Sequence, residues 1–192
     1  FDPDPDHPVQ YADVKNMILR AAEEQAVFVK DMCYYATDTF CADDVLLSRV
    51  TSCFLIRHPA RSIASYSKLD PAMTSEEIGL EAQWRVFSRL VDLLGKAPPL
   101  IDADDLQLDP AGTIARLCAR LGLAYADDAL QWRGLPPDWQ FVSGWHDSVA
   151  RSRGIEGRDP GPLPTLQGDR LLGMLDHHLP YYRRLHEHRL TS

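Results

Sequence analysis

The sequence predicts an α/β fold in which helices cover a small parallel sheet. Short apolar runs at residues 26–29, 52–56 and 98–101 each change from apolar to charged at their carboxyl end, as the strands of open parallel sheets do where a ligand binds. Amphipathic helical patterns separate the runs, and this alternation favours parallel pairing. The length of 192 residues fits one domain spanning residues 1–192, with a single core.

The N-terminal part opens with an irregular segment and continues as a helix. Residues 1–8 are rich in proline and aspartate, which excludes regular structure. Four apolar residues then repeat at helical spacing and predict a helix: Val14, Met17, Ile18 and Ala21.

Two of the apolar runs end at basic residues. Residues 26–29 form a short β-branched run that predicts a buried strand ending at Lys30. The run at residues 52–56 ends at Arg57, and Pro59 begins a helix directly afterwards. We therefore expect Arg57 to lie beside free helix N–H groups, a suitable place for a phosphate.

Two further helices follow from their end signals. Thr74 and Glu77 form a capping box that predicts the start of a long helix with a buried apolar stripe. Gly95 ends this helix, and the third strand follows it. Asp109 then caps another helix, with Pro110 inside its first turn.

A long loop separates that helix from the last one. Proline and glycine are frequent at about residues 134–167, which predicts an irregular loop, and loops of this length are usually functional or mobile. Two interpretations remain open for its aromatic residues Trp132 and Trp139: they line an apolar acceptor pocket, or they pin the loop to the core. A final helix runs from Gly168 and is broken or kinked at Pro180.

Composition excludes several classes of protein. The formal net charge of −8 argues against a general nucleic-acid binder, whose surface is normally basic, but not against one nucleotide in a local basic pocket. Apolar runs fall far short of the roughly 20 residues of a membrane helix, and no signal peptide is visible. The sequence therefore predicts no membrane and no nucleic-acid partner.

The cysteines and histidines do not indicate a metal or a disulfide framework. The four cysteines lack C-x-x-C spacing, and Cys53 and Cys118 lie within apolar patterns, so we expect buried, reduced thiols in a cytoplasmic protein. The paired histidines at residues 177–178 and 186–188 have no carboxylate or cysteine spacing beside them. A solvated helix face explains them better than a metal site does.

The segment from Phe54 to Ser65 is the most specific part of the sequence. Its strand ends at Arg57, and Ser65 follows eight positions later in the helix. This resembles the sulfotransferases that use 3′-phosphoadenosine-5′-phosphosulfate (PAPS), in which such an arginine and serine clamp the 3′-phosphate of the nucleotide. The resemblance is nearest to bacterial sulfotransferase-like proteins. It implies a P-loop NTPase-like parallel sheet, PAPS as donor with 3′,5′-adenosine bisphosphate (PAP) as product, a small-molecule acceptor and no required metal.

Two other segments extend the resemblance. Lys30 matches the lysine that approaches the 5′-phosphosulfate, so the resemblance implies a catalytic role for it. Ser152, Arg153 and Gly154 match the late loop that closes over the 3′-phosphate. In that family, the lysine neutralises the oxygen that bridges phosphorus and sulfur as the bond to sulfur breaks.

The sequence departs from the family in two places. No glycine- and serine-rich phosphosulfate loop precedes the first helix, and the chain begins with Phe1 rather than methionine. We therefore expect the sequence to be incomplete at its N-terminus. The catalytic histidine that often follows the lysine is also missing; Asp31 is the nearest group able to accept a proton, and His146 is an alternative. A turn-capping role for Asp31 remains open.

We therefore expect a sulfotransferase that moves a sulfuryl group from PAPS to a hydroxyl or amine of a small molecule. One alternative is a small-molecule kinase, which would need a Gly-Lys-Ser/Thr loop that these residues lack, and a magnesium-binding acid, for which residues 102–105 are the one candidate. The other alternative is a non-catalytic nucleotide-binding or scaffold protein on the same fold.

Overall fold

Two short parallel strands lie at the centre of the structure, a computed structural model that describes residues 7–132 and 147–191. Strand β1 (Phe54–Ile56) pairs with β2 (Leu100–Asp102), with the first and last residues of the two strands opposite each other. The second and third predicted strands are thereby confirmed, as is their parallel pairing. Within the described ranges no other strand joins this sheet.

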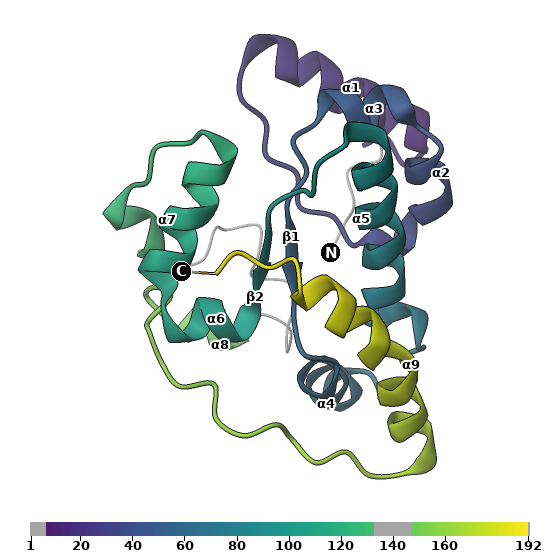
Figure 1. Ribbon diagram of the computed structural model, residues 1–192, viewed down its shortest axis with the longest axis vertical. Helices are drawn as coiled ribbons and strands as arrows, with labels where there is room; N and C mark the ends of the chain where they lie inside the picture. The colour runs from purple at the N-terminus through teal and green to yellow at the C-terminus, as the bar shows by residue number, and fades with distance from the viewer. Residues whose placement is uncertain (1–6, 133–146, 192) are drawn as a thin grey trace.

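Helices pack on both sides of the strands. In Figure 1, α5 and α9 lie on one side, and α6 and α7 lie on the other. The helices are α1 (Tyr11–Glu24), α2 (Thr37–Cys41), α3 (Asp44–Arg49), α4 (Pro59–Leu69), α5 (Leu80–Leu94), α6 (Ala103–Leu108), α7 (Pro110–Leu121), α8 (Asp147–Arg151) and α9 (Asp169–His186). Short 3₁₀ turns lie at Cys33–Tyr35, Glu76–Ile78 and Asp127–Leu130.

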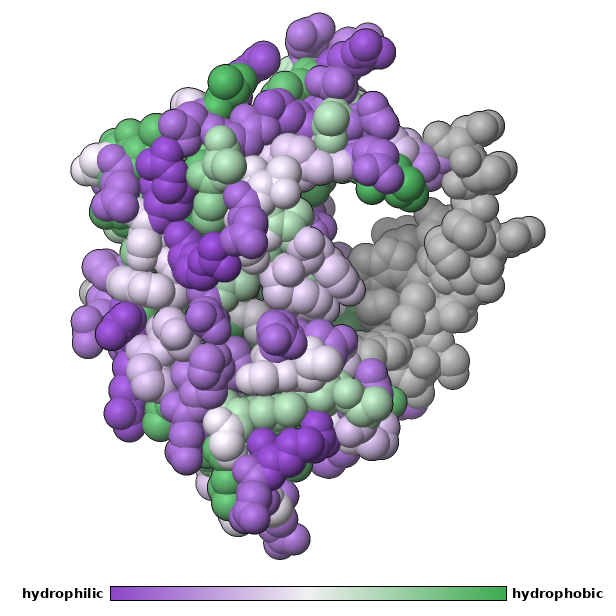
Figure 2. Space-filling model, turned by 90° about the vertical axis from the view of Figure 1, so that its right-hand side faces the viewer, coloured by the Kyte–Doolittle hydropathy of each residue, from purple (hydrophilic) through white to green (hydrophobic). Residues whose placement is uncertain are grey.

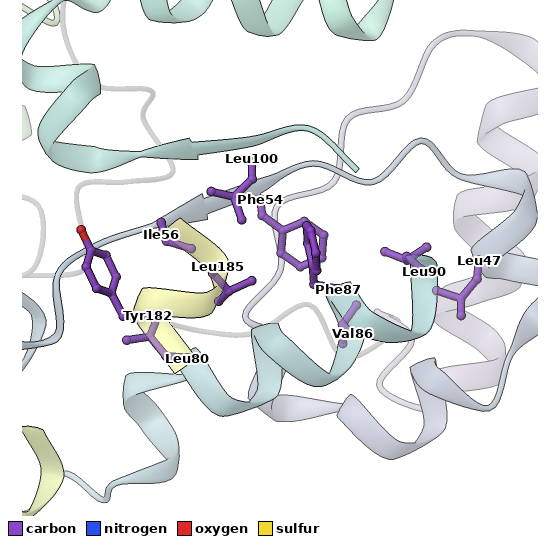
Figure 3. Packing of buried hydrophobic residues seen from close by; sticks show 10 residues of the cluster. All are labelled: Leu47, Phe54, Ile56, Leu80, Val86, Phe87, Leu90, Leu100, Tyr182 and Leu185. Atoms are coloured by element: carbon purple, nitrogen blue, oxygen red, sulfur yellow. The ribbon is translucent and has the colours of Figure 1, made fainter. Parts of the chain in front are cut away.

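The main core lies between the strands, α5 and α9 (Figure 3). The rings of Phe54 on β1 and Phe87 on α5 meet edge to face, with centroids 5.6 Å apart, a favourable aromatic arrangement. The cluster also takes Leu185 from α9, which is fully buried. Full burial of each such side chain stabilises the fold by roughly 1.5–3 kcal/mol.

A second cluster fixes α4, the helix that follows β1. Ile63 of α4 is fully buried in a cluster with Met174 of α9 and with Met73 and Leu166, which lie outside the helices. Arg170 of α9 adds hydrogen bonds to two backbone carbonyls of the segment after α4. These contacts hold α4 in a fixed position at the carboxyl end of β1.

The strand predicted at residues 26–29 is wrong. This segment forms neither a helix nor a strand, and Phe28 is 85% exposed. A strand of four apolar residues needs both a ladder partner and a surface to bury its side chains against. Within the described residues, the segment at residues 26–29 has no such ladder partner.

The predicted C-terminal end of α5 is confirmed, whereas its predicted start is not. Glu77 Oε2 accepts a hydrogen bond from Thr74 N at 2.6 Å, so the capping contact is present. However, α5 begins only at Leu80, because Gly79 adopts a left-handed conformation (φ 76°) that separates the 3₁₀ turn from the helix. Gly95 ends α5 in the same conformation (φ 66°), as expected.

Three further expectations can be compared with the described residues. All four cysteines are free thiols, but the expected burial is wrong for both Cys53, which is exposed, and Cys118, which is half-buried. Helix α9 continues through Pro180 without a break. The first part of the predicted loop at residues 134–167 lies outside the described residues; beyond it, α8 is followed by irregular backbone up to α9.

One face of the molecule shows how its hydrophobic residues are distributed. Figure 2 shows the side of the molecule on which α5 and α9 lie; over its described atoms, hydrophilic residues are mixed with separate hydrophobic ones rather than with one broad apolar patch. In the described part of the chain, no helix is long and apolar enough to cross a membrane.

Candidate functional site

A hollow of about 270 Å³ opens beside the carboxyl end of β1, and we call it the Arg57 hollow. One wall is α4 and the other is the irregular segment that leads to α9. Its lining residues are Arg57, Arg61, Ala64, Ser65, Lys68, Pro162 and Pro164. The predicted pair of Arg57 and Ser65 therefore faces the same space.

The Arg57 hollow is strongly basic. Its lining includes Arg57, Arg61 and Lys68 but no carboxylate, although the chain as a whole has a net charge of −8. Within the described residues, the Arg57 guanidinium has no hydrogen bond or ion pair. The Arg57 side chain is exposed, but neighbouring atoms displace part of the solvent around it; this partial desolvation, together with the charges of Arg61 and Arg158, lowers the pKa of Arg57, whereas Asp104 opposes this. A bound anion would relieve this repulsion between cations.

Arg61 holds the two walls of the hollow together. Its side chain is 11% exposed, and its Nε lies 2.9 Å from Asp104 Oδ2 at the start of α6. Its terminal nitrogens donate to the backbone carbonyls of Gly161 (2.5 Å) and Pro162 (3.4 Å). Arg61 is therefore committed to protein partners and fixes the segment that forms the second wall.

His58 occupies the helix terminus that we expected to be free. Its Nδ1 accepts a hydrogen bond from Ala60 N at 3.2 Å, and its carbonyl accepts from the N–H groups of Arg61 and Ser62 at 2.9 and 3.2 Å. The expectation of free helix N–H groups beside Arg57 is therefore wrong. An anion in this hollow has to be held by side chains.

The electrostatic setting of His58 agrees with its role as a cap. Burial lowers its pKa, and the charges of Arg61 and Arg183 act in the same direction, against Asp104 and Asp102. A ring whose Nδ1 accepts a hydrogen bond has to be neutral. His58 therefore positions α4 and is not available at Nδ1 as a proton acceptor.

The aspartates proposed for a kinase magnesium site are already engaged. Asp102 is 2% exposed; its Oδ2 accepts from Tyr182 Oη at 2.9 Å and its Oδ1 from Asp104 N at 2.7 Å. Asp105 pairs with Arg189 at 3.0 Å. Over the part of the chain that the structure describes, no group of three or more potential metal ligands occurs.

A second hollow of about 400 Å³ lies near α7, and we call it the Arg153 hollow. Its lining includes Arg153 and Gly154, but also the carboxylates Asp127 and Glu156. The neighbouring Ser152 uses its hydroxyl to donate to a carbonyl of its own turn. The structure therefore does not bring Ser152, Arg153 and Gly154 together with Arg57, and their role in nucleotide binding stays a prediction.

The predicted catalytic pair lies apart from both hollows. Lys30 is exposed, and its Nζ lies 3.2 Å from the Met32 sulfur. Asp31 Oδ1 accepts a hydrogen bond from Met32 N at 2.7 Å, which agrees with the turn-capping interpretation. Neither residue is among those that line the Arg57 hollow or the Arg153 hollow, and their catalytic roles stay predictions. His146 lies outside the described residues.

One aromatic residue of the late loop has a clear contact. Trp132 Nε1 donates to the carbonyl of Ser152 at 3.0 Å, which pins the two ends of the loop together. Trp139 lies outside the described residues. The contact joins Trp132 to the loop itself rather than to the core, so both interpretations of the aromatic residues stay predictions.

Three residues around Arg57 were not predicted from the sequence: His58, Arg61 and Lys68. Arg61, Ser65 and Lys68 have the spacing i, i+4, i+7 of one helix face, so the serine alone could have indicated both basic neighbours. His58 stands directly before Pro59, in the capping position of a helix that begins with proline.

The comparison with protein families agrees with this geometry. A family model described as a sulfotransferase domain matches residues 4–189, nearly the whole chain. The chain belongs to the sulfotransferase domain family. The resemblance seen in the sequence is thereby confirmed.

Two curated plant proteins are also similar to the chain. Branched-chain-amino-acid aminotransferase-like proteins 1 and 2 of Arabidopsis thaliana are 32% and 30% identical to it over 147 residues, which is 74% of this chain. The chain spans about a quarter (25%) of the length of these relatives. No solved structure matches significantly.

Proposed function

We propose that the chain is a sulfotransferase that uses PAPS and moves its sulfuryl group to a hydroxyl or amine of a small molecule. One observation carries the proposal: Arg57 and Ser65 line one basic hollow in a chain of the sulfotransferase domain family. The proposal includes the finer fold assignment, a P-loop-like nucleotide-binding sheet, with which the parallel pairing of β1 and β2 agrees.

The residues of the Arg57 hollow fit a phosphate. An arginine guanidinium presents a planar fork of donors that matches phosphate oxygens, and a serine hydroxyl adds one more donor. The Arg57 guanidinium has no protein partner among the described residues, so binding would not need an existing ion pair to break. In the proposed complex, Arg57 and Ser65 hold the 3′-phosphate of the nucleotide.

PAPS supplies the activated sulfuryl group, and the protein supplies positioning and charge. During transfer, a bond forms between sulfur and the acceptor oxygen or nitrogen while the bond from sulfur to the bridging oxygen breaks, and PAP leaves with that oxygen. Lys30 offsets the negative charge that develops on the oxygen. Asp31 or His146 accepts the proton of the acceptor.

Calorimetric titration with PAP tests the proposal. We expect micromolar binding to the wild-type protein and binding about 100-fold weaker to an Arg57→Ala variant. Lys96→Ala is a matched control, because Lys96 is exposed and precedes β2 at the opposite end of the strands. A folded wild-type protein that does not bind PAP would contradict the proposal.

A non-catalytic nucleotide-binding protein is the second candidate, because Lys30 is exposed and does not line the Arg57 hollow. Both candidates bind PAP, so turnover of PAPS with a panel of phenols, alcohols and amines separates them. Binding of PAP without turnover favours the second candidate. The kinase alternative has less support, because Asp102, Asp104 and Asp105 already have protein partners.

A further inference from the structure

We propose that Lys68 is a second phosphate-binding residue of the Arg57 hollow and makes the site selective for nucleotides with a 3′-phosphate. This inference rests on the proposed function and assigns a specific residue to its selectivity. It starts from the charges that line the hollow: the lining contains the three cations Arg57, Arg61 and Lys68 and no carboxylate.

Arg61 is excluded as the second binding group by its contacts. Its guanidinium is shared between the Asp104 carboxylate and the carbonyls of Gly161 and Pro162. Turning it toward a ligand would leave Asp104, which is 26% exposed, without its partner and would release the second wall. Breaking such a pair is costly.

Lys68 is the remaining cation among the residues that line the hollow. It is exposed in the last turn of α4, and no hydrogen bond or ion pair within the described residues uses its ammonium group. It follows Ser65 by three positions and Arg61 by seven, so the three side chains share one face of the helix. Lys68 and Ser65 therefore line the same hollow as Arg57.

The charge of the ligand calls for a second cation. A phosphate monoester carries a charge of about −1.5 to −2 at neutral pH, and Arg57 offsets one unit. The helix terminus is not a source of further donors, because His58 already uses the first N–H groups of α4. Lys68 completes the neutralisation of the dianion.

Titrations with PAP and with 5′-AMP, which lacks the 3′-phosphate, test the inference. We expect Lys68→Gln to weaken PAP binding about tenfold, as loss of a charged hydrogen bond does, and to leave 5′-AMP binding within about twofold. Lys68→Arg keeps the charge and should keep the preference for PAP. Lys96→Gln removes an exposed lysine elsewhere and should change neither affinity.

The outcomes separate this inference from the proposed function. If Arg57→Ala weakens PAP binding about 100-fold and Lys68→Gln binds PAP as the wild type does, Lys68 has no role and the proposed function stands. If Lys68→Gln weakens PAP and 5′-AMP equally, the residue acts on the fold rather than on the 3′-phosphate, and the inference is also wrong. If the folded wild-type protein binds no PAP, both fail.

Discussion

The Arg57 hollow and the Arg153 hollow differ in the charges of the residues that line them. In the Arg57 hollow, the lining residues are basic without a carboxylate, and Arg57 and Lys68 have no partner among the described residues. The larger Arg153 hollow mixes Arg153 with Asp127 and Glu156. Volume alone would favour the second hollow. The balance of charge favours the first as the place for a phosphorylated ligand.

The largest expected effect is on nucleotide binding. Arg57→Ala should weaken PAP binding by about 100-fold, because a bidentate charged contact of roughly 3 kcal/mol is lost. Arg153→Ala should change the affinity by less than about threefold, since a residue outside the Arg57 hollow contributes only through screened charge. Calorimetry on both variants measures this difference. Equal losses would show that the two hollows act on one nucleotide, as the family resemblance implies.

The second prediction concerns what holds the Arg153 hollow together. Gly154 lies opposite Gln131 in an antiparallel bridge, and a Cβ at position 154 would lie 2.5 Å from the backbone oxygen of Leu130. Gly154→Ala should therefore lower the free energy of unfolding by about 2 kcal/mol. Chemical denaturation measures the loss.

Gly157→Ala is the matched control for this prediction, because its Cβ would meet no atom closer than 3.5 Å. We expect it to be near neutral. If the hollows are independent, the folded Gly154→Ala protein should bind PAP as the wild type does. A loss of both stability and PAP affinity would mean that the close contact at Gly154 also supports the Arg57 hollow.

The same contrast shows what a single sequence can predict. The junction of β1 and α4 was predicted from local signals: an apolar run, a terminal arginine and a proline that fits the first helical position. These signals act over a few residues, so the strand, the helix and the shared hollow of Arg57 and Ser65 all appear in the structure.

The failures occurred where the outcome depends on distant parts of the chain. The run at residues 26–29 has strand composition, but whether it becomes a strand depends on a ladder partner and on cover from other elements. The position of Arg153 depends on the bridge between residues 131 and 154, which spacing does not reveal. His58 is different, because its position directly before Pro59 is a local capping signal that could have been recognised in the sequence.

The third prediction tests whether Arg61 is a structural link of the Arg57 hollow. Arg61→Met keeps much of the side-chain volume but leaves Asp104 and two loop carbonyls without a donor. The Arg61–Asp104 pair is neither fully exposed nor fully buried, so we expect a loss of about 1.5 kcal/mol in the free energy of unfolding. Arg116→Met, at a more exposed pair with a 3.4 Å separation, should cost less than about 0.5 kcal/mol. Similar losses in the two variants would mean that Arg61 holds no special link.

The smallest expected effect is a pH dependence of stability that comes from His178, which contacts the segment after α4. His178 on α9 is 1% exposed, and its Nε2 lies 2.7 Å from the Ser75 carbonyl, while its Nδ1 is buried without a hydrogen-bond partner in the described structure. Burial lowers its pKa below the ordinary value of 6.5; the His177 charge acts in the same direction, against Ser75, Glu81 and Glu76. His58, which caps α4, is shifted in the same direction.

A lowered folded pKa fixes the sign of this effect. Above pH 6.5 both the folded and unfolded states hold His178 neutral, so its contribution to stability is complete; as the pH falls below 6.5, the unfolded state binds a proton that the folded state does not. Stability therefore falls with acidification, by at most about 1.4 kcal/mol per pH unit for this group. Denaturation at a series of pH values should show a smaller loss of stability at acid pH in His178→Gln, which keeps a donor for Ser75, than in His7→Gln, which changes an exposed histidine.

Hydrogen exchange under the same conditions should show α4 and the segment around Ser75 losing protection before the bridge at Gly154, since the lining of the Arg153 hollow contains no histidine among its described residues. Simultaneous loss in both regions would mean that the two hollows open as one cooperative unit.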